Sequence, residues 1–552
     1  MNKFFYQYWN NDKKTKRLNP IFKYILIAIL IAFGIYCVAT INYSSSKRGP
    51  ELFAKYFKEI FKFKSDHADF KNENFWLVCL RTLFYTIQYT ALGSLIGFVL
   101  AFFSAYLASI NLHKHKSLTI TFKIVILILR SIPVFFFLAL FKSGFDKLLL
   151  ATLILSWFTW LWLHKYLVDI FETTNIKYFQ NDLLLGKSNF KAFLNDVSIR
   201  NKSKIIMLFV FSFESNLRWT TILSSAGLIG IGNLIVVNYF KDFAYIGIPL
   251  TLLLIVLILL EGITIFLNYL IFKPKEININ KKYSKIKRLF LRSDFYCWFL
   301  LIVMVAIFIS TLFQINYSVL SAKSIQDTFY SMIKPDYSYL VSNSKTIWYN
   351  FWIIIKIGYA GTLISFFLSL LIAILGNNKL NHFVFPIFTK LLLLIARIIP
   401  IALLFIMLRI IYQPEATLLL IIIFSISRSM SKFFIESINN VDEVKINNFK
   451  VFGYSKHRIL VRYILPEVWS ELITYTIFRF ELSFRNLINL GPLSTVGIGS
   501  LLYSFMSKDN ELDKVSALIL PIMISIILIE CINYGLMYFK KHNENKYALV
   551  NS

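Results

Sequence analysis

The chain has 552 residues, of which 57% are hydrophobic and only 16% are charged, whereas about a quarter of the residues of a soluble globular domain are charged. Its formal net charge is +29, but the Lys and Arg residues are scattered among short segments between apolar runs, where they ordinarily record membrane topology. The composition therefore excludes a soluble globular domain, and the scatter of the basic residues argues against a nucleic-acid-binding protein.

Apolar runs recur along the whole chain, and each is long enough to cross a bilayer core of about 30 Å. The first follows an N-terminal segment with five Lys or Arg residues, so we expect a retained signal anchor whose N-terminus lies in the cytoplasm. The predicted spans are 21–43, 78–109, 121–142, 148–165, 205–235, 246–272, 295–317, 347–376, 384–411, 415–434, 472–505 and 514–539. They predict an all-α polytopic membrane protein.

A basic segment, "KPKEININKKYSKIKRLFLRSD", divides the spans into six plus six. We predict a first domain at 1–272, made of the anchor span and a five-span core. A cytoplasmic linker follows at 273–294, and a second domain of the same topology occupies 295–552. With six spans in each half, both termini are expected in the cytoplasm.

The two halves share motifs at one fixed offset of 267 residues, which is the spacing between Glu214 and Glu481. The matching sets are Arg130, Ile132 and Pro133 with Arg397, Ile399 and Pro400, Gly186 and Ser188 with Gly453 and Ser455, Glu214 and Arg218 with Glu481 and Arg485, and Gly230–Gly232 with Gly497–Gly499. Such a register predicts a tandem duplication. The halves would run parallel, related by an axis along the membrane normal, and could enclose a central pathway.

The repeated Glu and Arg stand one helical turn apart inside apolar runs, close enough to neutralise each other. An isolated charge in mid-bilayer costs about 2.5–3.5 kcal/mol on insertion scales, so both should face the protein interior. One interpretation is a mutual salt pair that sets the rotation of the helix. The other is a positive lining for an anionic solute, since the Arg fork binds two oxygens at once. The residues concerned are Arg130, Arg218, Arg397, Arg485, Glu214 and Glu481.

Pro133 and Pro400 each remove a backbone hydrogen bond within a span, which predicts either a hinge or a simple kink. The two Gly-Ile-Gly elements allow helices to approach closely; their glycines are Gly230, Gly232, Gly497 and Gly499. Glu261 and Glu530, near the ends of the last span of each half, are expected to be topological or packing features.

Each half has a long cytoplasmic segment after its fourth span, at 166–204 and 435–471. In the second, Gly453 would form a turn, Ser455 would cap the next helix, and Pro466 would end it. A helical hairpin on the cytoplasmic face suits docking to a soluble partner, and an ordinary interfacial loop is the alternative.

These motifs carry a resemblance to a known family. Gly453 followed by Leu465–Pro466 resembles the "EAA…G…LP" coupling loop of permease subunits of bacterial ABC importers. The block "FRFELSFRNLINLGPLSTVGIGSLL" is similar to the signature of the phosphonate-type permeases. The resemblance implies a type I importer transmembrane domain, present twice. The matching loop positions are Gln180, Gly186, Ser188, Asn447, Gly453, Ser455, Leu465 and Pro466.

The chain departs from the family pattern in two ways. Gln180 and Asn447 stand where the family has Glu, and Ser198–Ile199 replaces Leu-Pro in the first half. Coupling through the first loop is therefore expected to be weaker, or its partner surface to differ.

The resemblance implies a permease for phosphonate or phosphate-ester anions in the bacterial cell membrane. Its partners would be two ATPase subunits, which bind ATP and Mg²⁺, and an extracytoplasmic solute-binding lipoprotein. The "GKS" at Gly186 lacks the Gly five residues earlier that a phosphate loop needs, so no cofactor is expected in this chain, and the dispersed His residues predict no metal site. Thiamine or thiamine phosphate is the alternative solute. An ion-coupled secondary transporter with 6+6 spans and a non-transporting scaffold are alternatives of another class.

Overall fold

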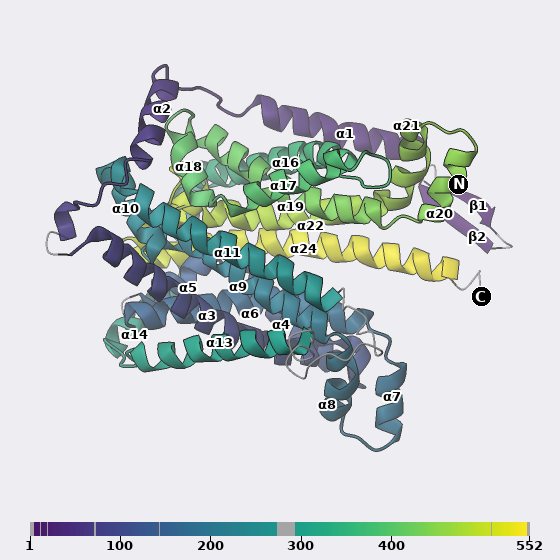
Figure 1. The fold of residues 1–552 in the computed structure, drawn as a ribbon, viewed down its shortest axis with the longest axis horizontal. Coiled ribbons are helices and arrows are strands. Elements are labelled where there is room, and N and C mark those ends of the chain that lie inside the picture. The colour runs from purple at the N-terminus through teal and green to yellow at the C-terminus, as the bar shows by residue number, and fades with distance from the viewer. Residues whose placement is uncertain are drawn as a thin grey trace, which may run out of the picture.

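The computed structural model describes residues 5–10, 13–18, 20–70, 73–142, 144–272, 293–508 and 511–548. Most of these residues lie in helices that run along a common direction (Figure 1). One short antiparallel hairpin, β1 (Phe5–Asn10) and β2 (Lys13–Leu18), precedes the first helix. The predicted all-α polytopic class is confirmed by this architecture. Most of the predicted linker, at 273–292, lies outside the described residues.

The helices of the first half are α1 (Pro20–Ala39), α2 (Gly49–Ile60), α3 (Phe75–Ala108), α4 (Lys116–Ser131), α5 (Val134–Phe141), α6 (Lys147–Thr173), α7 (Lys177–Leu184), α8 (Asn189–Ala192), α9 (Lys202–Ser225), α10 (Ile231–Lys241) and α11 (Gly247–Phe272). Those of the second half are α13 (Ser293–Gln314), α14 (Ala322–Ile333), α15 (Tyr337–Ser342), α16 (Ser344–Leu375), α17 (Val384–Ile398), α18 (Ile401–Arg409), α19 (Pro414–Asn439), α20 (Glu443–Val451), α21 (Lys456–Ile459), α22 (Leu465–Asn489), α23 (Ile498–Met506) and α24 (Leu512–Ala548). Short helical turns lie at η1 (Ala68–Phe70), η2 (Ile110–Leu112), η3 (Phe193–Ser198), η4 (Phe243–Tyr245) and η5 (Leu460–Ile464).

Long apolar sequences form helices here because a helix satisfies its backbone hydrogen bonds internally, as a bilayer requires. Side-chain caps fix where several of them begin. Asn74 accepts from the backbone N–H of Trp76 at 2.9 Å at the start of α3, and Asp146 accepts from that of Leu148 at 3.1 Å at the start of α6.

Helices lie at all twelve predicted span positions. Among the described residues, six helices are long and apolar enough to cross a membrane, or eight if each bent pair forms one span. The count of twelve spans stays a prediction. Two predicted spans were drawn too long, at 205–235 and 472–505, because α9 ends at Ser225 and α22 at Asn489, and a glycine-containing turn follows each.

The internal repeat extends from sequence to backbone geometry. The α4–α5 pair is bent by 73° at its break, and the α17–α18 pair by 81°. Gly186 and Gly453 both adopt positive φ, at 80° and 74°. A π-helical turn follows at the same place in each half, as η3 and η5. The division into domains at residues 272 and 295 remains a prediction.

The two halves exchange their first helices. Helix α1 packs against α16 of the second half, where the Tyr359 hydroxyl donates to the Leu30 carbonyl at 2.9 Å and the rings of Phe33 and Tyr359 lie 4.9 Å apart. Helix α13 packs against α3 of the first half, where Gln88 donates to the Ser310 hydroxyl at 3.4 Å. The first helix of each half therefore packs against the other half.

The ends of the helices define two opposite ends of the molecule. The β1–β2 hairpin, α7–α8, α20–α21 and the last turns of α24 gather at one end, while α2 and α14 lie at the other (Figure 1). The described parts of both termini thus lie on one side.

Pro466 does not end the helix that contains it, so that prediction was wrong. It lies in the first turn of α22, directly after the π-helical turn η5, and the helix continues to Asn489. The wide π turn already interrupts the regular hydrogen-bond ladder, which explains why a residue without an N–H is tolerated there.

The Gly-Ile-Gly elements lie where α10 and α23 press against the helix before them. A Cβ on Gly232 would lie 2.7 Å from the Cα of Thr221 in α9, and one on Gly499 would lie 2.9 Å from the Cα of Ile488 in α22. Gly230 and Gly497, at the start of these helices, have φ of 148° and 91°, which disfavours a side chain.

We expect Gly499→Ala to lower the thermal unfolding midpoint of the detergent-purified protein. The added methyl group would meet the backbone of Ile488, and overpacking costs about 1–3 kcal/mol. Gly262→Ala in α11 is the matched control, because a Cβ there meets nothing within 4 Å and Ala favours a helix over Gly. An equal loss in both variants would contradict the packing role of Gly499.

Candidate functional site

Each broken span leaves a backbone carbonyl without its helical partner. In a continuous helix, the carbonyl of Arg130 would accept from the N–H of Val134, and the bend before α5 removes that bond. The guanidinium of Arg485, from the other half, donates to this carbonyl instead. At the second break, Arg218 donates to the carbonyl of Arg397 at 3.0 Å. Both predicted breaks at Pro133 and Pro400 are thus kinks capped from the opposite half, and hinge motion stays a prediction.

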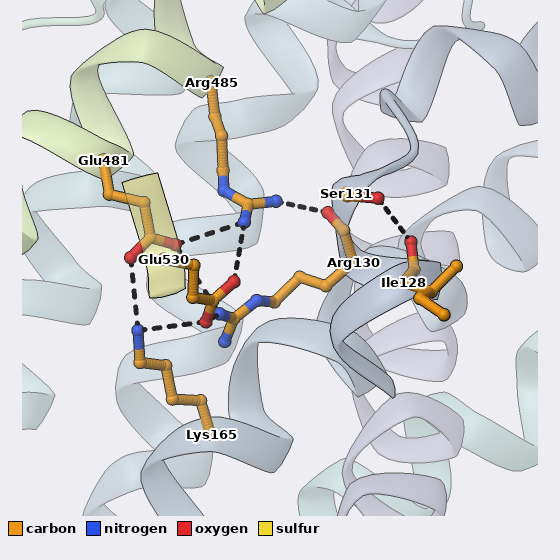
Figure 2. Close-up of polar contacts among 7 residues, drawn as sticks. All are labelled: Ile128, Arg130, Ser131, Lys165, Glu481, Arg485 and Glu530. Carbon is orange, nitrogen blue, oxygen red and sulfur yellow. Dashed lines mark hydrogen bonds and ion pairs between the residues drawn. The ribbon is translucent and has the colours of Figure 1, made fainter. Parts of the chain in front are cut away.

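The same residues build two clusters of buried charges. We name each cluster after the half that supplies its glutamates. The second charge cluster consists of Arg130, Lys165, Glu481, Arg485 and Glu530, and Figure 2 shows their side chains converging. Arg485 lies 3.1 Å from Glu481 and 3.4 Å from Glu530. Lys165 lies 3.4 Å from Glu481 and 3.6 Å from Glu530. Arg130 lies 3.5 Å from Glu481 and also pairs with Glu530.

The first charge cluster repeats this arrangement with the halves interchanged. It consists of Glu214, Arg218, Glu261 and Arg397. Arg218 pairs with Glu214 on its own helix. Arg397 reaches from the second half to Glu261 at 2.8 Å and to Glu214 at 3.4 Å. Arg428 lies at the same kink and donates to the carbonyl of Ala396 at 2.9 Å.

The ion pairs therefore cross between the halves in both directions. Arg130 of the first half pairs with two glutamates of the second, and Arg397 of the second pairs with two glutamates of the first. The predicted pairs along each helix are present as well. Glu214 and Glu481 are 0% and 2% exposed, so these charges are stabilised by one another and not by water.

Sequence reasoning missed several members of the clusters. Glu261 and Glu530 were expected to be topological or packing features, but they are 5% and 1% exposed and pair with the crossing arginines. Lys165, and Arg428 at the kink beside the first cluster, were not singled out. Their signal was present, because a basic residue inside an apolar span is a candidate functional residue by default.

A cavity of about 240 Å³ adjoins the second charge cluster. Its polar wall carries Arg130, Lys165, Arg479, Glu481 and Arg485. The aromatic part of its wall is formed by Trp157, Phe158, Trp162, Tyr166, Phe211, Trp219 and Phe478. Residues of α6 and α9 from the first half face α22 from the second, so the cavity lies between the halves. It can hold a small solute with a charged group at one end.

The predicted coupling loops are two hairpins of the same shape. Ser188 caps α8 by accepting from the N–H of Lys191 at 3.4 Å, and Ser455 caps α21 by accepting from that of Arg458 at 3.4 Å. Gln180 and Asn447 are exposed on α7 and α20, Gly186 and Gly453 form the turns, and Leu465 and Pro466 begin α22. The first hairpin keeps this shape although it lacks Leu-Pro.

The tips of both hairpins expose apolar side chains. Leu184 and Val451 are each 86% exposed, and Leu185 and Phe452 are each 76% exposed. Matching apolar residues therefore have matching exposure beside the turn glycine of each hairpin. They lie at the same end of the molecule (Figure 1).

Comparison with known proteins gives two relatives along most of the chain. The ABC transport system permease protein p69 of Mycoplasma genitalium is 29% identical over 537 residues, 96% of each chain. The protein of the same name from Mycoplasma pneumoniae is 30% identical over 465 residues, 82% of this chain and 83% of its own. The phosphite transport system permease protein PtxC of Stutzerimonas stutzeri is 28% identical over 101 residues, 18% of this chain and 36% of its own.

No family model matches the chain, and no solved structure matches it. The two p69 relatives nevertheless match this chain over most of its length and most of theirs. The chain belongs to the family of ABC transport system permease proteins.

Proposed function

We propose that this permease carries small phosphonate or phosphate-ester anions across the plasma membrane as part of an ATP-driven, binding-protein-dependent importer. The cavity beside the second charge cluster supports this proposal most directly. Four basic side chains line it against one carboxylate, Glu481, and Arg binds phosphate oxygens in pairs. The weaker likeness to a phosphite permease agrees with this choice of solute.

The two hairpins, in this proposal, dock two ATPase subunits on the cytoplasmic side. Their exposed apolar tips, Leu184–Leu185 and Val451–Phe452, supply contact area that needs a partner to cover it. ATP and Mg²⁺ would be bound by those subunits and not by this chain, and both termini would lie in the cytoplasm. A solute-binding lipoprotein would deliver the solute at the opposite end.

The charge clusters give this scheme a mechanism. Closure of the ATPase subunits would draw the hairpins together, and the force would reach α22 directly because η5 continues into it. Helix α22 carries Glu481 and Arg485, which hold the first-half kink. Movement of α22 would then shift the kink and open the cavity to the other side.

Thiamine or thiamine phosphate is a second candidate solute, favoured by the aromatic wall of the cavity. Trp157, Trp162 and Trp219 offer flat apolar faces against which a ring could stack. The cationic wall would hold the phosphate of the phosphorylated form.

The proposal is tested by purifying the tagged chain in several mild detergents and identifying the proteins that accompany it. We expect an ATPase subunit and a binding lipoprotein, whose bound ligand names the solute. Uptake of that solute by cells should stop on ATP depletion. Uptake that survives ATP depletion but stops with an uncoupler, without any accompanying ATPase, would instead establish an ion-coupled secondary transporter.

A further inference from the structure

The internal repeat allows the two sides of the molecule to be compared position by position. The cavity residues of α6 have counterparts on α19, 267 residues later in the chain. Lys165 corresponds to Lys432, Trp162 to Ser429, and Leu161 to Arg428.

The two sides differ in how they use their basic residue. Lys165 is half-buried, lines the cavity, and lies within 3.6 Å of both glutamates of the second charge cluster. Lys432 is exposed. On that side, Arg428 extends to the kink and donates to the carbonyls of Ala396 and Ile399, at 2.9 Å and 3.4 Å. The large guanidinium therefore lies where the cavity side has only Leu161.

Two tryptophans of the cavity wall also carry hydrogen-bond donors that have no acceptor. The indole N–H groups of Trp157 and Trp162, both in the cavity wall, are buried without a hydrogen-bond partner among the described residues. A buried donor without an acceptor costs about 1–3 kcal/mol. Their counterparts, Phe424 and Ser429, carry no such donor, since the Ser429 hydroxyl already donates to Ile426 at 2.9 Å.

We propose that the cavity binds the oxyanion group of the transported solute on one side of the pseudo-symmetric pair only, with Lys165 as the residue that selects for negative charge. This inference rests on the proposed function as an importer of phosphonate-type anions. The second charge cluster contains three basic residues and two glutamates, so it holds one positive charge in excess. The oxygens of the anion would accept from Lys165 and, once the rings of Trp157 and Trp162 turn toward it, from their indole N–H groups, which are buried in this structure. Its organic part would pack on the aromatic wall.

The test measures stabilisation of the purified full-length chain in nanodiscs by a dilution series of phenylphosphonate, with uncharged benzyl alcohol as the matched probe. We expect phenylphosphonate to raise the unfolding midpoint of the wild type. Lys165→Met should weaken its binding about ten- to a hundred-fold, since a charge-assisted hydrogen bond is lost. Lys165→Arg should retain most of the affinity. Lys432→Met, at the matched position of the other side, should bind as the wild type does.

A second variant separates binding from folding. Trp162→Phe keeps an aromatic face but replaces the indole by a smaller phenyl ring without an N–H, and it should weaken phenylphosphonate binding about two- to ten-fold. Lys165→Met is expected to fold, because two arginines and two glutamates remain in balance. The proposal is overturned if Lys432→Met and Lys165→Met weaken binding equally, if neither does, or if the wild type responds to benzyl alcohol as strongly as to phenylphosphonate.

Failure of this inference can be told from failure of the proposed function. If cells carrying Lys165→Met still take up the solute at the wild-type rate in an ATP-dependent manner, the importer stands and the role of Lys165 falls. If uptake by the wild type does not need ATP, the importer itself is wrong.

Discussion

Replacement of Glu481 by Gln is expected to abolish solute uptake and to destabilise the protein by about 3–5 kcal/mol, the cost of breaking a buried ion pair on one side. Glu481 is 2% exposed and lies within 3.5 Å of Arg130, Lys165 and Arg485. Without it, three basic groups would share Glu530 alone. The measurements are the unfolding midpoint in detergent and uptake by cells.

A control variant and a double variant are needed to interpret that result. Glu51→Gln, at an exposed carboxylate on α2, should change neither stability nor uptake. The double variant Glu481→Gln with Lys165→Gln returns the cluster to one excess positive charge, so it should recover much of the stability but not the uptake. A single Glu481→Gln variant with wild-type stability would show that the crossing ion pairs do not hold the halves together.

Replacement of Phe452 by Asp is expected to abolish association with the ATPase subunit while leaving the permease folded. Phe452 is 76% exposed at the tip of the second hairpin, so a charge there disturbs no core. A buried aromatic at the centre of an interface commonly contributes 2 kcal/mol or more, roughly a thirty-fold loss of affinity. Co-purification of the ATPase and ATP-dependent uptake are the two readouts.

The chain supplies both the control and a comparison for this experiment. Phe313, at the end of α13 far from the hairpins, is 87% exposed, and Phe313→Asp should leave association intact. Leu185→Asp changes the matching position of the first hairpin. A smaller effect at Leu185 than at Phe452 would fit the missing Leu-Pro of the first loop. Association that persists in both hairpin variants would count against these tips as the docking surface.

Features with a local cause could be predicted from the sequence. Helices lie where the apolar runs are, because backbone groups in a bilayer have no other partner. The bends follow from Pro133 and Pro400, and the hairpin turns from Gly186 and Gly453. The pair of Glu481 with Arg485 follows from spacing along one helix.

Features that depend on the partner of a helix could not be predicted. Because the halves carry the same motifs, the sequence does not distinguish an Arg130 that pairs within its half from one that crosses to Glu481. The packing of α1 and α13 against the opposite half could not be predicted either, since the sequence of an apolar helix does not specify which helix it packs against. Pro466 was misjudged because a π turn, which depends on local backbone geometry, tolerates it.

The crossing of ion pairs also bears on how the protein is made. Arg485 follows Arg130 by 355 residues in the chain. At a synthesis rate of about 5–20 residues per second, the first kink would wait roughly 20–70 s for the guanidinium that caps it. During that interval Arg130 lies in a first half whose pairing glutamates, Glu481 and Glu530, have not yet been translated, while Glu214 and Arg218, on one helix, can already neutralise each other. Until the second half is made, the first half therefore carries a kink carbonyl and a basic side chain without the partners that they have in the complete protein.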